Sequence, residues 1–185
     1  MQPAPATDLL RPVLELPIVG VRLRPFLPTD APTLAQHAND RAIWLNLRDR
    51  FPHPYTLKDA EWYVKFVHNE GRNDLHLCIE AAGEAVGSIS VLFQDDINRR
   101  EAEIGYWLAR SCWGKGIATA AVKALSDYVL AHFDICRLYA TVFEYNPASA
   151  RVLEKAGFVL EARLRKSITK AEQTVDGLLF ALVKD

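Results

Sequence analysis

Short apolar stretches, several of them alternating with polar residues, recur along the chain. A period of two is typical of a strand with one buried face, because successive side chains point to opposite sides. The polar Gly83-Glu84 turn between two of the stretches predicts a hairpin. The predicted strands are 21–26, 75–82, 85–94, 101–109, 136–143, 158–168 and 175–183.

The alternation is most informative along 101–109. The apolar row consists of Ala102, Ile104, Tyr106 and Leu108. The opposite row consists of Glu101, Glu103, Gly105 and Trp107. This strand therefore presents two carboxylates on the face opposite its apolar row, and we assign its two large aromatic side chains to packing.

Apolar residues at helical spacing predict four helices between the strands. Thr29 or Asp30 can cap the first, and Thr56 opens the second with the character of a capping box. Pro147 stands in the first turn of the last helix, which ends at Gly157. The expected helices are 30–39, 56–71, 118–132 and 147–157.

The order of these elements, β-α-α-β-β-β-α-β-α-β-β, predicts one mixed sheet with helices on both faces. This is an α+β (mixed α/β) fold, with a single domain over 21–185. Residues 1–20 contain four prolines and lack a charged start followed by an apolar core. We expect them to form a flexible N-terminal arm that is neither a signal peptide nor an anchor.

Composition narrows the range of partners. Half of the 185 residues are apolar and the net charge is −1, so nothing global favours nucleic acid or a membrane surface. The three cysteines form no CxxC pair, and the five histidines show no ligand spacing, so we expect neither disulfides nor a metal site. Without an expected disulfide, the sequence is consistent with a reducing, cytoplasmic compartment. Cys112 lies near the candidate loop below but has no His or Asn motif beside it, which argues against a nucleophile.

The sharpest local signal is the glycine turn Trp113-Gly114-Lys115-Gly116-Ile117-Ala118-Thr119 between a strand and a helix. Glycines before a helix let the backbone approach a ligand, and the first free N–H groups suit a phosphate. Lys115 can add a charge. A tight turn that binds nothing has the same pattern. The glycine spacing excludes a P-loop, and Thr119 together with the late position excludes the Rossmann fingerprint.

Six motifs in order make the chain from about residue 21 to 184 resemble the GNAT N-acetyltransferases, in particular the branch of ribosomal-protein acetyltransferases RimJ and RimL. They are L-R-P-F-x-x-x-D (23–30), P-Y-T-L-x-D-A (54–60), A-E-I-G-Y-W-L (102–108), W-G-K-G-I-A-T (113–119), N-P-A-S-A-R (146–151) and E-K-A-G-F (154–158).

The resemblance implies a mostly antiparallel sheet of about seven strands. Two splayed parallel strands, here 101–109 and 136–143, would hold acetyl-CoA between them. It assigns cofactor contacts to Leu108, Trp113, Gly114, Lys115, Gly116, Ile117, Ala118, Thr119 and Asn146. Trp113 replaces the usual Arg or Gln of the pyrophosphate loop, a small departure because backbone N–H groups form the cradle.

Glu103 is our candidate general base, since transfer needs an unprotonated amine and Glu103 resembles the base position of some GNAT enzymes. The alternatives are an ion pair with Arg99 or Arg100, Glu101 as a substitute base, or a water relay. A strand N–H between Tyr106 and Leu108 would stabilise the oxyanion.

For the thiolate's proton, the tyrosine that many GNAT enzymes use is replaced here by Leu153. The N-x-x-S pattern of the branch, matched by Asn146 and Ser149, instead implies that Ser149 is the acid and that Asn146 binds the pantetheine arm. The alternatives are that Ser149 is an ordinary capping or solvent-facing serine of the first turn and that Asn146 is a plain cap before Pro147. Asp176 matches an acidic position of the branch without a physical role.

Three functions remain open. The first is acetyl transfer from acetyl-CoA to a protein or peptide N-terminus, as in RimJ and RimL. The second is acetylation of a small amine such as a polyamine, aminoglycoside or amino acid, and the third is a non-catalytic acyl-CoA-binding module. Loops 41–55 and 169–174 are expected to frame the amine's entrance. An acidic substrate surface is a minority interpretation of Arg48, Arg50 and His53, which a solvated loop also explains. The branch is also consistent with a homodimer.

Overall fold

The computed structural model describes residues 11–68 and 74–184. Its strands form one eight-stranded sheet in the order β1-β2-β3-β4-β5-β6-β8-β7. The strands are β1 (Leu14–Glu15), β2 (Val21–Arg24), β3 (Leu75–Ala81), β4 (Glu84–Phe93), β5 (Glu101–Leu108), β6 (Arg137–Phe143), β7 (Val159–Lys170) and β8 (Gln173–Val183). All neighbours in this sheet are antiparallel except β5 and β6, which confirms the mixed, mostly antiparallel architecture.

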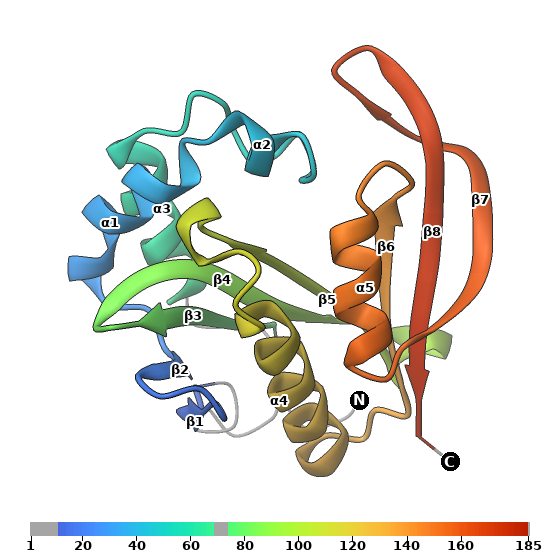
Figure 1. Ribbon diagram of the computed structural model, residues 1–185. Helices are drawn as coiled ribbons and strands as arrows, with labels where there is room; N and C mark the ends of the chain where they lie inside the picture. Colours follow the sequence, from blue (N-terminus) through green and yellow to red (C-terminus); the bar gives the residue numbers. More distant parts are fainter. Residues whose placement is uncertain (1–10, 69–73, 185) are drawn as a thin grey trace.

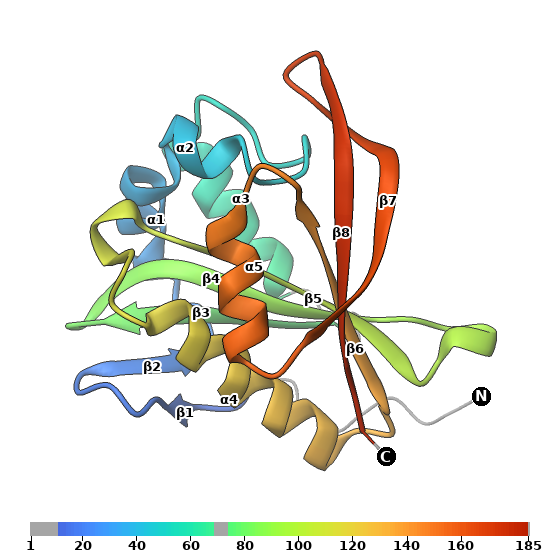
Figure 2. The same cartoon turned by 45° about the vertical axis from the view of Figure 1, so that its right-hand side comes forward.

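The helices lie on both faces of the sheet, as expected (Figures 1 and 2). They are α1 (Ala31–Ala38), α2 (Arg41–Trp44), α3 (Leu57–Val67), α4 (Ile117–His132) and α5 (Pro147–Lys155), with 3₁₀ turns η2 (Pro28–Asp30), η3 (Asp96–Asn98) and η4 (Arg110–Cys112). The larger apolar cluster joins the sheet to α4 and α5, and the smaller one joins it to α1 and α3. No described helix is long and apolar enough to cross a membrane.

The start signals read from the sequence act where they were expected. Thr56 caps α3, accepting from Asp59 N while the Asp59 carboxylate accepts from Thr56 N. Asp30 is the N-cap residue of α1, as expected, but its side chain makes no capping bond to α1 and instead accepts from Leu27 N before η2. The expected end of α3 near residue 71 falls outside the described residues. α2 was expected to be loop; Asp40 caps it by accepting from Ala42 N.

The N-terminal arm needs a correction. Leu14 and Glu15 pair with β2 to give the eighth strand, one more than the seven expected. Leu16 is buried in the larger apolar cluster. Residues 14–16 therefore belong to the sheet and its core rather than to a loose arm, because a two-residue strand is too short to show a period in the sequence.

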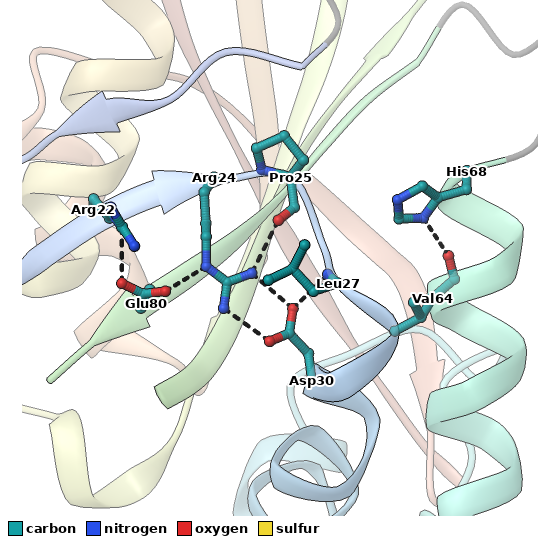
Figure 3. A network of polar contacts seen from close by, with 8 residues as sticks. All are labelled: Arg22, Arg24, Pro25, Leu27, Asp30, Val64, His68 and Glu80. Atoms are coloured by element: carbon teal, nitrogen blue, oxygen red, sulfur yellow. Dashed lines mark hydrogen bonds and ion pairs between the residues drawn. The ribbon is translucent and has the colours of Figure 1, made fainter. Parts of the chain in front are cut away.

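A buried guanidinium joins β2, β3 and the start of α1 (Figure 3). Both terminal nitrogens of Arg24 donate to the Asp30 carboxylate at 2.8 Å, and its Nε donates to Glu80. Arg22 donates to the other Glu80 oxygen at 2.8 Å. Burial alone would raise the pKa of Glu80, but the two arginines outweigh it and hold that pKa below its usual range. At the far end of α3, His68 contacts the Val64 carbonyl oxygen.

Candidate active site

The parallel strands β5 and β6 separate after a short paired section. Their registered pairs are Glu101 with Arg137, Ala102 with Leu138 and Glu103 with Tyr139. No pairing between the two continues beyond Glu103 in the described chain, although β5 runs on to Leu108. The strands therefore splay, and the sheet opens at its centre (Figure 2).

Backbone groups of β5 face this opening. In an antiparallel pair, alternate residues exchange hydrogen bonds with the partner strand. Ala109 N donates to Val86 O at one end of the β4–β5 pair, and Gln94 N donates to Glu101 O at the other. The odd-numbered residues thus bond to β4. The backbone N–H and C=O groups of Ile104, Tyr106 and Leu108 consequently point towards the gap.

The glycine turn delivers a bare helix end beside the gap. Gly114 (φ 75°) and Gly116 (φ 78°) have left-handed backbones, which few other residues adopt. Gly116 is the N-cap of α4, and no side chain caps this helix. The first helical bond runs from Ala120 N to Gly116 O, so the N–H groups of residues 117–119 have no partner within the helix.

The space in front of this turn fits a bound anion. A Cβ built on Gly114 or Gly116 would meet no described atom within 4 Å. The positive end of a 16-residue helix dipole and three free N–H groups would then face a phosphate directly. The exposed Lys115 lies between the two glycines, whereas Ile117 is buried and anchors the turn in the core.

Trp113 connects the turn to the end of β5. Its indole Nε1 donates to Leu108 O at 2.7 Å, so that carbonyl oxygen is already bonded. The ring is half exposed, and the Arg110 guanidinium lies 6.0 Å from its centroid. The residue thus fixes the turn against the strand, a role that the sequence pattern did not indicate.

Glu103 lies on the sheet face away from α4 and α5. Its partner is Arg48 in the loop after α2, rather than either neighbouring arginine expected from the sequence. Arg99 instead bonds the Asp96 carbonyl oxygen, and Arg100 pairs with Asp134. Glu101, the substitute base, pairs with Arg137 at 3.3 Å. Tyr139 lies opposite; burial, followed by the charges of Glu103 and Glu101, raises its pKa.

Ser149 lies in the first turn of α5, and α5 packs on the opposite face of the sheet. Its Oγ lies 2.8 Å from the Tyr106 hydroxyl, which links α5 to β5 across the opening. Asn146 caps the helix by accepting from Ser149 N at 3.1 Å, so the capping role is real. Leu153 is fully buried and offers no acid.

Tyr106 is the polar exception on an apolar row. Its ring packs against the larger cluster, but its hydroxyl lies 2.8 Å from Ser149 Oγ and 3.3 Å from Ser149 O. Burial raises the pKa of Tyr106 to about 12, against the opposing effect of the Ser149 bond. The assignment to packing accounts for the ring only. Trp107 packs against the smaller cluster, and its ring centroid lies 5.9 Å from that of Phe51.

Residues 40–49, which we call the α2 segment, span the gap on the Glu103 side. Asp40 pairs with Arg110 of η4 at 2.9 Å, and Arg48 pairs with Glu103. Leu45 O accepts from the Tyr145 hydroxyl at 2.6 Å, beyond the end of β6. The segment is thus tied to residues that follow both splayed strands.

The β7–β8 hairpin reaches the same segment, as Figures 1 and 2 indicate. Lys170 Nζ lies 2.8 Å from Asp49 Oδ1 and 3.9 Å from the centroid of the Trp44 ring. The two loops expected to frame an entrance therefore meet at a buried lysine. Sequence reasoning missed this lysine because nothing local links residues 121 positions apart.

The other two residues considered from the sequence, Cys112 and Asp176, lie among protein groups that account for them without a catalytic role. Cys112 is buried, and its sulfur lies 4.0 Å from Ser111 Oγ. Asp176 accepts from Lys166 N at 2.9 Å and from Arg163 Nε at 2.6 Å, and both bonds lower the pKa of Asp176. The bond to Lys166 N also stabilises β7 where its register with β8 shifts, between Leu164 and Ile168. Within residues 11–68 and 74–184 no cluster of His, Cys, Asp and Glu could hold a metal.

Comparisons with known proteins agree with this geometry. A family model described as an acetyltransferase (GNAT) domain matches residues 21–159. An uncharacterised N-acetyltransferase, p20 of Bacillus licheniformis, is 30% identical over 162 residues, covering 84% of this chain and 88% of the relative. The spermidine N(1)-acetyltransferase of Escherichia coli K12 is 27% identical over 147 residues, covering 78% and 76%.

Among solved structures, RimJ of Mycobacterium smegmatis in complex with CoA-disulfide superposes with a TM-score of 0.80 at 28% identity. The match covers 94% of this chain and 86% of RimJ. The range matched by the family model covers the glycine turn, both splayed strands and α5, the elements of the candidate site. The chain belongs to the GNAT family of N-acetyltransferases.

Proposed function

We propose that this protein transfers the acetyl group of acetyl-CoA to the free N-terminal amine of a protein or peptide. One observation carries the proposal. A carboxylate, Glu103, lies on one face of the opening between β5 and β6, and a hydroxyl, Ser149, belongs to the helix on the other face. An amine and a thioester that meet in the opening would have a proton acceptor on one side and a donor on the other.

The cofactor side is built from backbone. The N–H groups of residues 117–119 would bind the pyrophosphate, with Gly114 and Gly116 leaving room for it and Lys115 adding charge. The gap-facing backbone groups of Ile104 and Tyr106, together with the Leu108 N–H, would align the pantetheine arm, and one N–H would stabilise the oxyanion. Asn146 Oδ1 is already used as a cap, which leaves its amide nitrogen for the arm.

The nitrogen must lose two protons and the sulfur must gain one. Glu103 accepts the first proton from the incoming ammonium, which has to displace Arg48 from that carboxylate, and Glu103 then passes this proton to water. As the new C–N bond forms, the nitrogen gives its second proton to the ionised Glu103, the C–S bond breaks, and the Ser149 hydroxyl gives its proton to the departing thiolate. Arg48 then returns to Glu103 once the carboxylate is ionised again.

The similarity to RimJ supports a protein or peptide terminus as the acceptor. The α2 segment and the β7–β8 hairpin, which are joined at Lys170, form the proposed frame of the entrance through which that terminus would reach Glu103. The cytoplasm is the proposed setting, since the three cysteines are free thiols.

A small cationic amine is the second candidate, favoured by the spermidine-acetylating relative and by the carboxylates of Glu101 and Glu103 on the acceptor face. A non-catalytic acyl-CoA-binding module is less well supported, because such a module has no need for the Glu103 and Ser149 pair.

Calorimetric titration with acetyl-CoA, free CoA and a long-chain acyl-CoA tests the cofactor side. Release of CoA is then measured with peptides that have a free N-terminus, with the same peptides blocked by N-acetylation, and with spermidine. We expect turnover of the free peptides alone. Turnover of spermidine but of no peptide would replace the first function by the second, and the absence of any CoA binding would refute both.

A further inference from the structure

The Tyr106 and Ser149 hydroxyls share a hydrogen bond, and its direction decides whether Ser149 has a proton left to donate. Tyr106 has one proton to donate and two acceptors within reach, Ser149 Oγ at 2.8 Å and Ser149 O at 3.3 Å. If it donates to the carbonyl oxygen, the Ser149 proton is used on the phenol oxygen. If it donates to Oγ, the Ser149 proton is free to point elsewhere.

The surroundings favour the second arrangement once a sulfur is present. The distance to Oγ is the shorter of the two, and the tyrosine ring is held by the larger apolar cluster on the α4 and α5 side. Ser149 N is bonded to Asn146, so the backbone of this turn is fixed as well. A thiolate in the gap would accept the free proton of Ser149 while Tyr106 donates into the same oxygen.

We propose that Tyr106 is a positioning residue that aims the hydroxyl of Ser149 at the sulfur of CoA. The inference rests on the proposed function, in which Ser149 protonates the thiolate. Tyr106 itself transfers no proton. As the Ser149 proton moves to the thiolate, a water molecule replaces it in the same step, so no free alkoxide forms, and the hydroxide left behind takes up the proton that Glu103 releases. A hydrogen bond into Oγ also polarises that hydroxyl, because bonds in a chain strengthen one another.

A binding measurement tests this without needing an acceptor. The affinities of free CoA and of desulfo-CoA, which lacks the thiol, are measured by calorimetry between about pH 6.5 and 9.5. The preference for CoA should grow with pH in the wild type, since an aimed hydroxyl stabilises the thiolate. Tyr106 keeps its proton over this whole range, as its raised pKa requires.

The variants are Tyr106→Phe, Ser149→Ala and the double variant. Each single change should reduce the alkaline preference for CoA by about tenfold, the size of one hydrogen bond, and the double variant should lose no more than Ser149→Ala. Tyr128→Phe, on α4 where Tyr128 stacks on His132 at 4.3 Å, is the matched control and should behave as wild type. Thermal unfolding of each variant checks that the fold is retained.

Each outcome has one meaning. If Ser149→Ala lowers the preference and Tyr106→Phe leaves it unchanged, the positioning role is wrong and the proposed function stands. If Ser149→Ala also leaves it unchanged, or the wild type shows no preference, Ser149 is not the donor, and the positioning role of Tyr106 fails together with the acid role of Ser149; acetyl transfer itself is tested separately by the release of CoA. Additive losses in the double variant would show that Tyr106 acts on the cofactor independently of Ser149.

Discussion

Lys170 Nζ lies 2.8 Å from Asp49 Oδ1, which joins the tip of the β7–β8 hairpin to the α2 segment. The lysine side chain is 2% exposed, whereas the aspartate side chain is 75% exposed. The lysine also lies over the Trp44 ring, so the aromatic face shields the ammonium where water cannot reach it. The contact closes one side of the proposed entrance for the amine.

Lys170→Met should loosen this closure without emptying the space. The KM for the acceptor should rise about three- to tenfold, the order expected for losing a shielded cation–π contact and one ion pair. The affinity for acetyl-CoA should not change, because Lys170 is not among the residues proposed to bind the cofactor. Steady-state kinetics and calorimetry measure the two quantities. Asp49→Asn keeps the lysine over Trp44 and should have a smaller effect; equal KM values in all three proteins would remove Lys170 from the entrance.

Gly116→Ala should weaken acetyl-CoA binding strongly, and Gly116→Glu should abolish it. The left-handed backbone makes any side chain cost about 1–2 kcal/mol, and the new Cβ would occupy the open space before the free N–H groups. A glutamate adds like charge against the pyrophosphate.

Gly83 provides the control for this effect. It has a similar φ of +82° and equally open surroundings, but it lies in the β3–β4 turn. Gly83→Ala should lose similar stability and keep its affinity for acetyl-CoA. Calorimetric titration and thermal unfolding of both alanine variants separate strain from ligand contact, and undiminished binding by Gly116→Glu would exclude the turn as a phosphate cradle.

Arg24→Met should destabilise the fold by about 3–5 kcal/mol, because the buried Asp30 would lose its partner and the buried Glu80 would keep only Arg22. Arg22→Met is the matched control. Its side chain is 43% exposed, and losing its pair with Glu80 should cost under about 1 kcal/mol. Urea unfolding measures the free energy of unfolding of both variants. Equal losses would show that burial of the arginine does not determine how much its ion pairs stabilise the fold.

The same network predicts a dependence on pH. Since the folded pKa of Glu80 is lowered, the stability that it contributes is present above its unfolded pKa of about 4.5 and is lost as the pH falls through the lower folded value. Removing Arg24 removes the main attraction for that carboxylate. The unfolding free energy of Arg24→Met should therefore fall less steeply than that of wild type below about pH 4.5.

Local signals in the sequence were sufficient for most elements of the fold. The Thr56 capping box, the alternation of β5 and the paired glycines before α4 act within a few residues, and each appears where it was expected. β1 and α2 were missed because two and four residues are too few to show a period.

The contacts that define the site were harder to predict because they join distant residues. Arg48 meets Glu103 across 55 positions, and Tyr106 meets Ser149 across 43. A hydroxyl on an otherwise apolar row of β5 was the one available hint of the second contact. Nothing local marks Arg48, since it stands in a loop whose arginines are equally well explained by solvation.

Glu103→Gln should lower kcat by about 10²–10⁴-fold, the usual contribution of a positioned general base. The loss should be greatest at low pH, where most of the amine carries a proton that must be removed before attack. In the variant, the rate should rise with pH as the free amine becomes available, and it should approach wild type near the pKa of the amine.

Glu101→Gln is the control, since Glu101 lies on the same face of β5 but pairs with Arg137. A pH–rate profile settles the role of Glu103. If the Glu103→Gln profile matches wild type in height and shape while Glu101→Gln is impaired, the base is Glu101; if neither changes, water relayed through the backbone carbonyls removes the proton.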